Sequence, residues 1–253
     1  MDEYVETGND SPESEAGIQA FVERYSFPVD DFQIEAIHHL IAGRSVLVAA
    51  PTGTGKTLVA EFAIWQAQQR NQRVIYTTPL KALSNQKYRD LRELYGVENV
   101  GLVTGDIVEH SRASIVIMTT EVYRNMLLEE GGERFAQGSE NLGAIPSSLA
   151  DVGFVVFDEL HYLSDIERGP VWEEAIICSP PMCNWLAFQP QSAMPKSWRA
   201  GSVVCIAPLR WSCMSSEPCH WSIIIFSITN CILCRMPMGC VLIVFPAWVA
   251  RQS

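Results

Sequence analysis

The chain has 253 residues, 48% of them hydrophobic, which is enough to bury the core of one large domain or two small ones. This composition excludes collagen-like, coiled-coil and wholly disordered proteins. A net charge of −11 argues against a strongly basic nucleic-acid binder, though not against one whose contacts are confined to a groove. The first residues are acidic and contain no apolar run, so no secretory signal is predicted and a cytoplasmic protein is expected.

The composition changes abruptly near residue 178. Residues 1–177 contain no Cys and carry a net charge of −15, whereas residues 178–253 contain all eight Cys, one acidic residue and a net charge of +4. About a quarter of the residues of a soluble domain are normally charged, far more than in this second part. We therefore predict an acidic disordered tail over residues 1–16, a folded domain over residues 17–177 and an aberrant tail over residues 178–253.

Short apolar runs alternate with segments of helical spacing along the first part of the chain. The predicted helices cover residues 31–42, 58–69, 80–95 and 121–128, and the predicted strands cover residues 45–49, 73–78, 100–104, 114–118 and 152–157. A polar, Gly-rich loop is predicted over residues 131–143. Strands that alternate with helices favour an α/β fold with a parallel sheet and helices on both faces.

A phosphate-binding loop is predicted between the first strand and the helix that follows it. The segment Ala-Pro-Thr-Gly-Thr-Gly-Lys-Thr at 50–57 matches G-x-x-x-x-G-K-[ST], except that Ala50 replaces the first Gly. In this motif backbone N–H groups surround the phosphates, Lys56 reaches the β- and γ-phosphates, and Thr57 coordinates Mg²⁺. The predicted ATP-binding residues are Pro51, Thr52, Gly53, Thr54, Gly55, Lys56 and Thr57. An ordinary glycine turn between strand and helix is the alternative.

An acidic motif, Asp158-Glu159-Leu160-His161, follows the strand predicted over residues 152–157. Asp158 at the carboxyl end of a buried strand is suitably placed to hold Mg²⁺, directly or through water. Glu159 can orient and deprotonate an attacking water. The alternative is a solvated strand end without catalytic chemistry.

These two motifs and their spacing resemble those of superfamily-2 DExH-box helicases over residues 25–177, which implies a RecA-like P-loop domain. The resemblance implies that Phe27 stacks on adenine and that Gln33 hydrogen-bonds the edge of the base. A core aromatic residue and a solvated helix residue are the alternatives for this pair. His161 is expected to couple the ATP site to the strand-binding side, or else is simply packed. The segment 168–174, Arg-Gly-Pro-Val-Trp-Glu-Glu, is similar to the superkiller and exosome-cofactor branch, whose members act on RNA.

The resemblance also implies weak binding of single-stranded RNA, or of DNA, along three further motifs. The implied contact residues are Pro79, Lys81, Ala82, Asn85, Gln86, Thr104, Gly105, Asp106, Thr119, Thr120 and Glu121. Hydroxyl and backbone N–H contacts to phosphates do not require a strongly basic surface. A solvated helix face and strand-end caps are the alternatives for these residues.

Two parts that the family requires are expected to be missing. One is a second RecA-like domain with its arginine finger, and the other is a Ser-Ala-Thr triplet after the acidic motif, which does not occur in residues 178–253. With free choice of synonymous codons, reading residues 182–206 one base earlier permits HVQLACLSATVSNAEELAGWISSVH, which contains the triplet. We therefore predict that the tail is out of frame, after loss of a base near Pro180-Pro181. Strands 45–49 and 152–157 would then lack their shared neighbour, unless residues 202–206 replace it by chance, and the isolated chain would aggregate.

Two other functions remain open from the sequence. An ATP-binding fragment without motor activity fits the same motifs. A membrane-anchored P-loop protein would need a span within residues 221–250, but Arg235 and two prolines interrupt this segment, so we expect no membrane span. Cys231 and Cys234 form a single C-x-x-C, for which neither metal binding nor a disulfide is expected.

Overall fold

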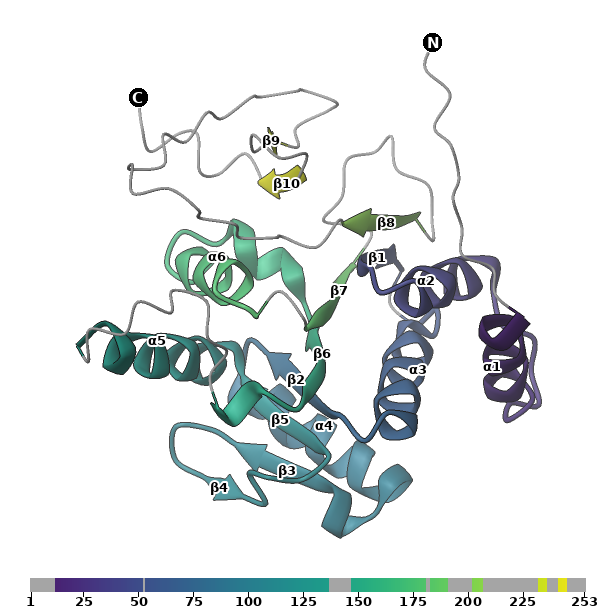
Figure 1. The fold of residues 1–253 in the computed structure, drawn as a ribbon, viewed down its shortest axis with the longest axis horizontal. Coiled ribbons are helices and arrows are strands. Elements are labelled where there is room, and N and C mark those ends of the chain that lie inside the picture. Colours follow the sequence, from purple (N-terminus) through teal and green to yellow (C-terminus); the bar gives the residue numbers. More distant parts are fainter. Residues whose placement is uncertain are drawn as a thin grey trace.

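A mostly parallel β-sheet forms the centre of the computed structural model (Figure 1), which describes residues 12–51, 53–136, 147–180, 183–190, 202–206, 232–235 and 241–244. Within these ranges the sheet has eight strands in the order β4-β3-β5-β2-β6-β7-β1-β8. The inner pairs are parallel, and only β4 and β8 run antiparallel to their neighbours. The strands are β1 Ser45–Ala50, β2 Arg73–Thr78, β3 Val100–Val103, β4 Val108–Glu109, β5 Ile115–Thr119, β6 Val152–Phe157, β7 Asn184–Pro190 and β8 Ser202–Ile206.

Helices cover both faces of this sheet, as the alternating sequence pattern predicts. The helices are α1 Pro12–Val22, α2 Asp31–Ile41, α3 Lys56–Gln69, α4 Lys81–Tyr95, α5 Thr120–Ala136 and α6 Gly169–Ile177. Three 3₁₀ turns, η1 Val97–Asn99, η2 Ser147–Leu149 and η3 Leu160–Ser164, lie between them. The buried residues of α1 to α4 share one hydrophobic cluster, and those of α5 and α6 share another.

Alternation along each central strand separates these two hydrophobic clusters. In β1, Val46 and Val48 face the cluster of α1 to α4, whereas Leu47 and Ala49 face that of α5 and α6. Successive side chains of a strand point to opposite faces, so a strand covered on both sides needs an uninterrupted apolar run. All six residues of β1 and all six of β6 are accordingly buried.

The strand between β1 and β6 corrects the prediction made for the tail. β7 lies parallel to both neighbours, with Leu186 opposite Val46 of β1 and opposite Val156 of β6. The prediction that these two strands lose their shared neighbour is therefore wrong, and so is the fallback that residues 202–206 fill the gap, because β8 pairs with the outer side of β1. The low charge of the tail suits a central strand that is buried on both faces. Aggregation was expected because β1 and β6 would lack a shared neighbour. Since β7 is present between them, that reason no longer holds.

Two boundaries near helices also differ from the sequence predictions. Within the disordered tail predicted over residues 1–16, residues 12–16 are helical instead, because α1 begins at Pro12, a residue favoured at the first position of a helix; residues 1–11 lie outside the described residues. Phe21 of α1 is fully buried, with its ring 5.1 Å from that of Phe62. The prediction of a loop over residues 131–143 is also wrong for residues 131–136, since α5 continues to Ala136. Arg124 of α5 and Glu174 of α6 form an ion pair of 3.5 Å, which shows that tertiary packing supports this helix.

The last described strands, β9 Ile232–Arg235 and β10 Val241–Val244, form a separate antiparallel pair. Cys231 of the C-x-x-C lies outside the described residues, as does most of the segment 221–250. Among the helices that the structure describes, none is long and apolar enough to cross a membrane.

We expect the cysteine just before β7 to resist alkylation in the folded chain. Cys183 is buried, its thiol donates to the Val152 carbonyl over 3.1 Å, and burial raises its pKa to about 12. At pH 8 this pKa leaves about a thousandfold less thiolate than the ordinary cysteine value near 8.5. Peptide mapping after a timed iodoacetamide pulse should show Cys178, which is exposed, modified well before Cys183. Equal labelling of the two thiols would contradict the packing of β7.

Candidate functional site

The predicted phosphate loop connects the carboxyl end of β1 to the first turn of α3. Gly53 and Gly55 have φ angles of +84° and +77°, in the left-handed region that favours glycine. A Cβ added at Gly55 would also lie 2.7 Å from the Gln33 side chain. Thr54 closes the loop by donating its hydroxyl to the Pro51 carbonyl over 2.8 Å. Thr52 lies outside the described residues, and Thr57 is exposed in the first turn of α3.

The ammonium group of Lys56 lies over the ends of β1 and β7. It donates to the Ala50 carbonyl over 2.7 Å and to the Gln189 carbonyl over 3.4 Å. Burial lowers the pKa of Lys56, while the carboxylates of Glu159 and Asp158 oppose this by favouring its charged form. A phosphate group brought to the positive end of α3 would meet this lysine directly.

Gln33 is buried and bonds to the phosphate loop rather than standing free in solvent. Its side-chain amide donates to the carbonyl of Gly55 over 2.8 Å and to that of Thr54 over 3.4 Å. Its side-chain oxygen accepts the backbone N–H of Asp30 over 2.9 Å and completes a capping box for α2. The alternative of a solvated helix residue is therefore wrong for Gln33. Phe27 is 52% exposed, with its ring 5.3 Å from that of Tyr25, so it is not a core residue.

The acidic motif begins where β6 ends, and its first carboxylate is held from two sides. Asp158 Oδ1 accepts the backbone N–H of Glu159 over 3.0 Å, and Oδ2 accepts the hydroxyl of Tyr76 over 2.8 Å. Tyr76 belongs to β2 and is buried, which raises its pKa well above the usual value, with Asp158 contributing further. Its hydroxyl therefore stays protonated at neutral pH. The sequence analysis did not identify Tyr76. A buried tyrosine hydroxyl needs a partner, and this requirement is the signal that could have found it.

Glu159 turns the chain away from the strand into η3. Its φ of 58° is left-handed, a conformation that costs a non-glycine residue about 1–3 kcal/mol. The turn brings Glu159 Oε2 to 3.1 Å from His161 Nδ1. His161 is partly exposed and its ring lies 4.7 Å from that of Tyr162. The contact links Glu159 to His161, the residue expected to couple the ATP site to the strand-binding side.

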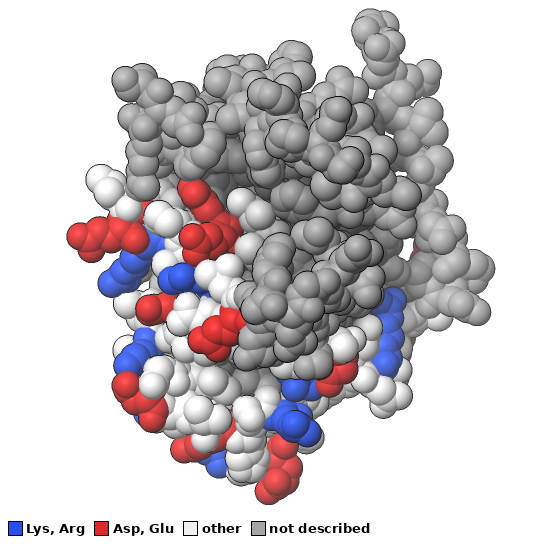
Figure 2. Space-filling view, turned by 60° about the vertical axis from the view of Figure 1, so that its left-hand side comes forward, with Lys and Arg blue, Asp and Glu red and all other residues white. Residues whose placement is uncertain are grey.

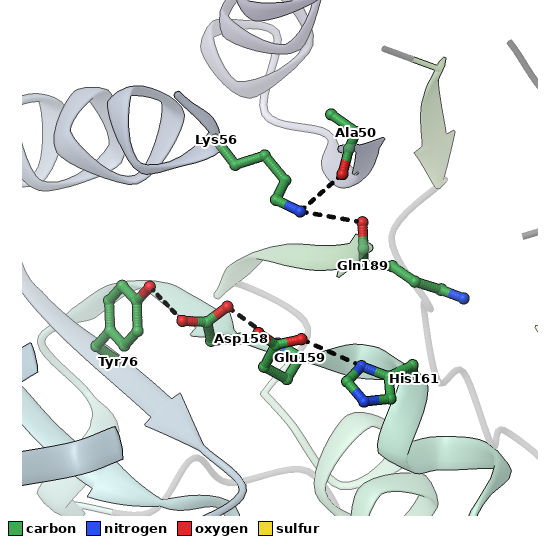
Figure 3. A network of polar contacts seen from close by, with 7 residues as sticks. All are labelled: Ala50, Lys56, Tyr76, Asp158, Glu159, His161 and Gln189. Atoms are coloured by element: carbon green, nitrogen blue, oxygen red, sulfur yellow. Dashed lines mark hydrogen bonds and ion pairs between the residues drawn. The ribbon is translucent and has the colours of Figure 1, made fainter. Parts of the chain in front are cut away.

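The phosphate loop and the acidic motif lie at the same edge of the sheet. β1, β7 and β6 run parallel, so Ala50, Pro190 and Phe157 all lie at carboxyl ends. Figure 3 shows Lys56 and Gln189 on one side of this edge and Asp158, Glu159 and His161 on the other. The arrangement combines a cation, carboxylate oxygens and a glycine loop in one place, next to the amino end of α3.

The residues predicted to bind nucleic acid lie at the carboxyl edge of the other half of the sheet. Pro79, Lys81, Ala82, Asn85 and Gln86 follow β2, while Thr104, Gly105 and Asp106 follow β3, and Thr119, Thr120 and Glu121 lie where β5 passes into α5. The strands β2, β5 and β3 are neighbours, so three separate motifs meet along one edge. The structure thus brings these residues together.

Side chains in this group divide into exposed and internally bonded ones. Lys81 is exposed and forms an ion pair with Asp106, which joins the start of α4 to the loop after β3. Thr119 and Thr120 are buried: Thr119 accepts the backbone N–H of Val122 over 3.4 Å, and Thr120 donates to the Thr78 carbonyl over 3.3 Å. The Thr119 hydroxyl thus makes the local contact expected of a helix-start cap, whereas the Thr120 hydroxyl joins the end of β5 to the end of β2.

In the segment 168–174 after the acidic motif, Gly169 and Trp172 are buried inside the domain. A Cβ added at Gly169 would lie 2.5 Å from the Leu163 carbonyl, so this close approach requires glycine. Trp172 is buried, with its ring 5.9 Å from that of Phe157 at the end of β6. Trp172 therefore packs against the end of the strand that leads into the acidic motif.

The described surface carries both signs of charge. In Figure 2, acidic and basic side chains are interspersed over the visible described face, without an extended basic patch. Among the described residues, no group of three or more His, Cys, Asp or Glu side chains is arranged to hold a metal ion by itself. A divalent cation would thus depend on fewer protein ligands and on oxygens of a bound phosphate, as is usual for Mg²⁺.

Comparison with known proteins decides the family. The DEAD/DEAH box helicase family matches residues 30–194, well over half of the chain. The chain belongs to this helicase family. The match continues beyond the composition change and includes β7, in agreement with the sheet. It confirms the RecA-like α/β fold and the DExH-box resemblance inferred from the motifs.

Curated relatives of this DExH-box helicase domain are helicases, some of them named as RNA helicases. It is 45% identical over 178 residues to the chloroplastic DExH-box ATP-dependent RNA helicase DExH15 of Arabidopsis thaliana, covering 70% of this chain. It is 47% identical over 156 residues to the antiviral helicase SKI2 of Saccharomyces cerevisiae, covering 62%. It is 40% identical over 196 residues to the exosome RNA helicase MTR4 of Mus musculus, covering 78%. The chain spans 11–16% of the length of these relatives.

A solved structure confirms the helicase fold. The DUF1998 helicase MrfA bound to DNA and AMPPNP matches 74% of this chain and 28% of its own, with a TM-score of 0.51 and 22% identity. At this identity the similarity concerns the fold alone.

Proposed function

We propose that this helicase domain is the ATP-binding lobe of an ATP-dependent DExH-box RNA helicase. The observation that carries the proposal is the convergence of Lys56 with Asp158 and Glu159 at the carboxyl ends of β1 and β6, across β7. The named relatives support RNA as the substrate of the whole protein. In such a protein ATP hydrolysis would drive strand separation together with a second lobe.

The residues present fit ATP with Mg²⁺. Gly53 and Gly55 supply the left-handed turns of the loop, and a Cβ at Gly55 would collide with Gln33, so glycine lets the loop keep the backbone form that surrounds a phosphate in this motif. Lys56 supplies the cation for the β- and γ-phosphates, and the oxygens of Thr57 and Asp158 are the hard ligands that Mg²⁺ prefers. Mg²⁺ would neutralise the charge that develops on the phosphates.

Glu159 is the proposed general base. It follows the metal-binding carboxylate directly and is held in a left-handed turn, with its carboxylate against His161. In this position it would orient a water and accept its proton. His161 would link that carboxylate to η3, and through η3 to the strand-binding edge. Phe27 and Gln33 would bind the adenine, with Gln33 connecting the base to the phosphate loop that it already contacts.

The experiment that tests this proposal measures nucleotide affinity with a fluorescent ADP. Lys56→Ala removes a charge that faces the phosphates, and charge-assisted contacts of this kind are worth about 1.5–3 kcal/mol, or about 10–150-fold in affinity. Arg89→Ala removes one positive charge from an exposed position of α4 and is the matched control. Unchanged nucleotide affinity in Lys56→Ala would refute the assignment of the phosphate loop.

We further propose that the sequence after about Pro180 is out of frame. In the frame one base earlier, Ser-Ala-Thr falls at positions 189–191, and residue 189 lies at the end of β7 beside Lys56. Either frame supplies an apolar run at 185–188, Trp-Leu-Ala-Phe as translated and Leu-Ala-Cys-Leu in the other frame, so either can form a buried strand. The nucleotide sequence around codons 176–184 tests this proposal. The proposal fails if restoring one base near Pro180-Pro181 does not read through Ser-Ala-Thr into a second helicase domain.

A further inference from the structure

Tyr76 contacts the first carboxylate of the acidic motif, that of Asp158, and is placed to orient it. Tyr76 lies in β2, opposite Val156 of the neighbouring strand β6, and its side chain extends along the sheet to Asp158. Figure 3 shows the hydroxyl directed at Asp158 from the side away from Lys56. The ring is buried, with Lys87 Nζ 5.6 Å above its centre, so packing holds the hydroxyl in one position.

The two oxygens of Asp158 each have one fixed donor. Oδ2 accepts the Tyr76 hydroxyl over 2.8 Å, and Oδ1 accepts the backbone N–H of Glu159 over 3.0 Å. Donors on both oxygens define the plane of the carboxylate. A carboxylate oxygen has about two lone-pair sites, so each oxygen keeps one for a metal ion or its water. The N–H of Glu159 belongs to the turn that follows the strand, which leaves Tyr76 as the donor that comes from a rigid, buried strand.

We propose that Tyr76 is a positioning residue that orients the Asp158 carboxylate toward the Mg²⁺ of bound nucleotide. This inference rests on the proposed function of the site. Groups that hydrogen-bond a metal-binding carboxylate commonly change metal affinity by about 10–100-fold when they are removed. Without the hydroxyl, Asp158 would keep only the N–H of Glu159 and could rotate about its side-chain bonds. Nucleotide contacts made by the phosphate loop would be unaffected.

The test compares ADP binding with and without magnesium in the full 253-residue chain. Tyr76→Phe keeps the buried ring and removes only the hydroxyl. We expect the Mg²⁺ concentration that gives half of the magnesium-dependent gain in ADP affinity to rise about 10–100-fold, with ADP affinity in EDTA within about twofold of wild type. In an Asp158→Asn background, Tyr76→Phe should add no further effect, because the tyrosine acts through that carboxylate.

The matched control is Tyr88→Phe. Tyr88 of α4 donates to a carboxylate of Glu109 over 2.7 Å, so this variant removes the same kind of bond away from the phosphate loop. It should leave the magnesium response unchanged. A 3-fluorotyrosine placed at position 76 keeps a donor of the same shape and should retain the response, and its fluorine resonance should shift when Mg²⁺ is added to the ADP complex. The fluorine measurement still tests the proposal if the Tyr76→Phe variant does not fold.

Three results would overturn the inference. The first is an unchanged magnesium response in folded Tyr76→Phe, and the second is an equal loss of ADP affinity with and without Mg²⁺. The third is a fluorine resonance that does not shift when Mg²⁺ is added. A wild-type chain that binds ADP without any magnesium-dependent gain contradicts the metal site of the proposed function, and this inference with it. The wild-type titration therefore separates failure of the site from failure of the role of Tyr76.

Discussion

The 253-residue chain is expected to turn over ATP close to the background rate, and the frame-restored protein about 10³–10⁵-fold faster. The proposed site supplies a phosphate loop, a carboxylate for Mg²⁺ and a base, all from this one lobe. In the resembling helicases an arginine finger from the second lobe completes the site. Such arginines contribute about 10³–10⁵ in the rate of related phosphoryl transfers.

Phosphate release with and without single-stranded RNA is the measurement for both proteins. The frame-restored protein should be stimulated by RNA, and its Glu159→Gln variant should bind ATP but lose turnover, because the base is absent. RNA-stimulated turnover by the 253-residue chain, at a rate similar to that of the restored protein, would show that a second lobe is not needed.

A charge in the middle of β7 is expected to unfold the domain. Leu186 is fully buried between β1 and β6, opposite Val46 and Val156. Losing a buried leucine side chain costs about 2–5 kcal/mol, and an unpaired buried carboxylate adds about 3–5 kcal/mol. Domains are stable by only about 5–15 kcal/mol, so Leu186→Asp should be largely unfolded in water.

The matched control for this variant is Asn184→Asp. It places the same charge at the partly exposed first residue of β7 and should leave the urea midpoint nearly unchanged. Circular dichroism in increasing urea compares the two variants with the wild-type chain. A wild-type midpoint in Leu186→Asp would mean that residues 184–190 do not form the central strand.

The parts of the fold that the sequence predicts well are those whose pattern is local. β2 and β6 have the predicted bounds, because a buried parallel strand is a short apolar run. β7 is also such a run, but its surroundings are poor in charge and rich in Cys and Trp, and this change of composition led the sequence prediction to omit it. The continuation of α5 over Gly131 was missed because the low helix propensity of glycine predicts a loop there.

The candidate site was predictable where chain order brings residues together. The phosphate loop and the acidic motif each follow a predicted strand, so their meeting at one sheet edge depends only on both strands being parallel. The contacts of Gln33 with the loop carbonyls and of Tyr76 with Asp158 join elements that are far apart in the chain. The hydrophobic periodicity of the sequence does not predict such contacts. Only the rule that buried polar groups need partners indicates that they exist.

One edge of the sheet is proposed to bind a magnesium nucleotide between the phosphate loop and the acidic motif. Calorimetric titration of ADP into the 253-residue chain, with Mg²⁺ and then with EDTA, tests it most directly. We predict a single saturable site per chain whose affinity falls when Mg²⁺ is removed. A folded chain that shows no saturable ADP binding, or the same affinity under both conditions, would contradict the proposed magnesium-nucleotide site.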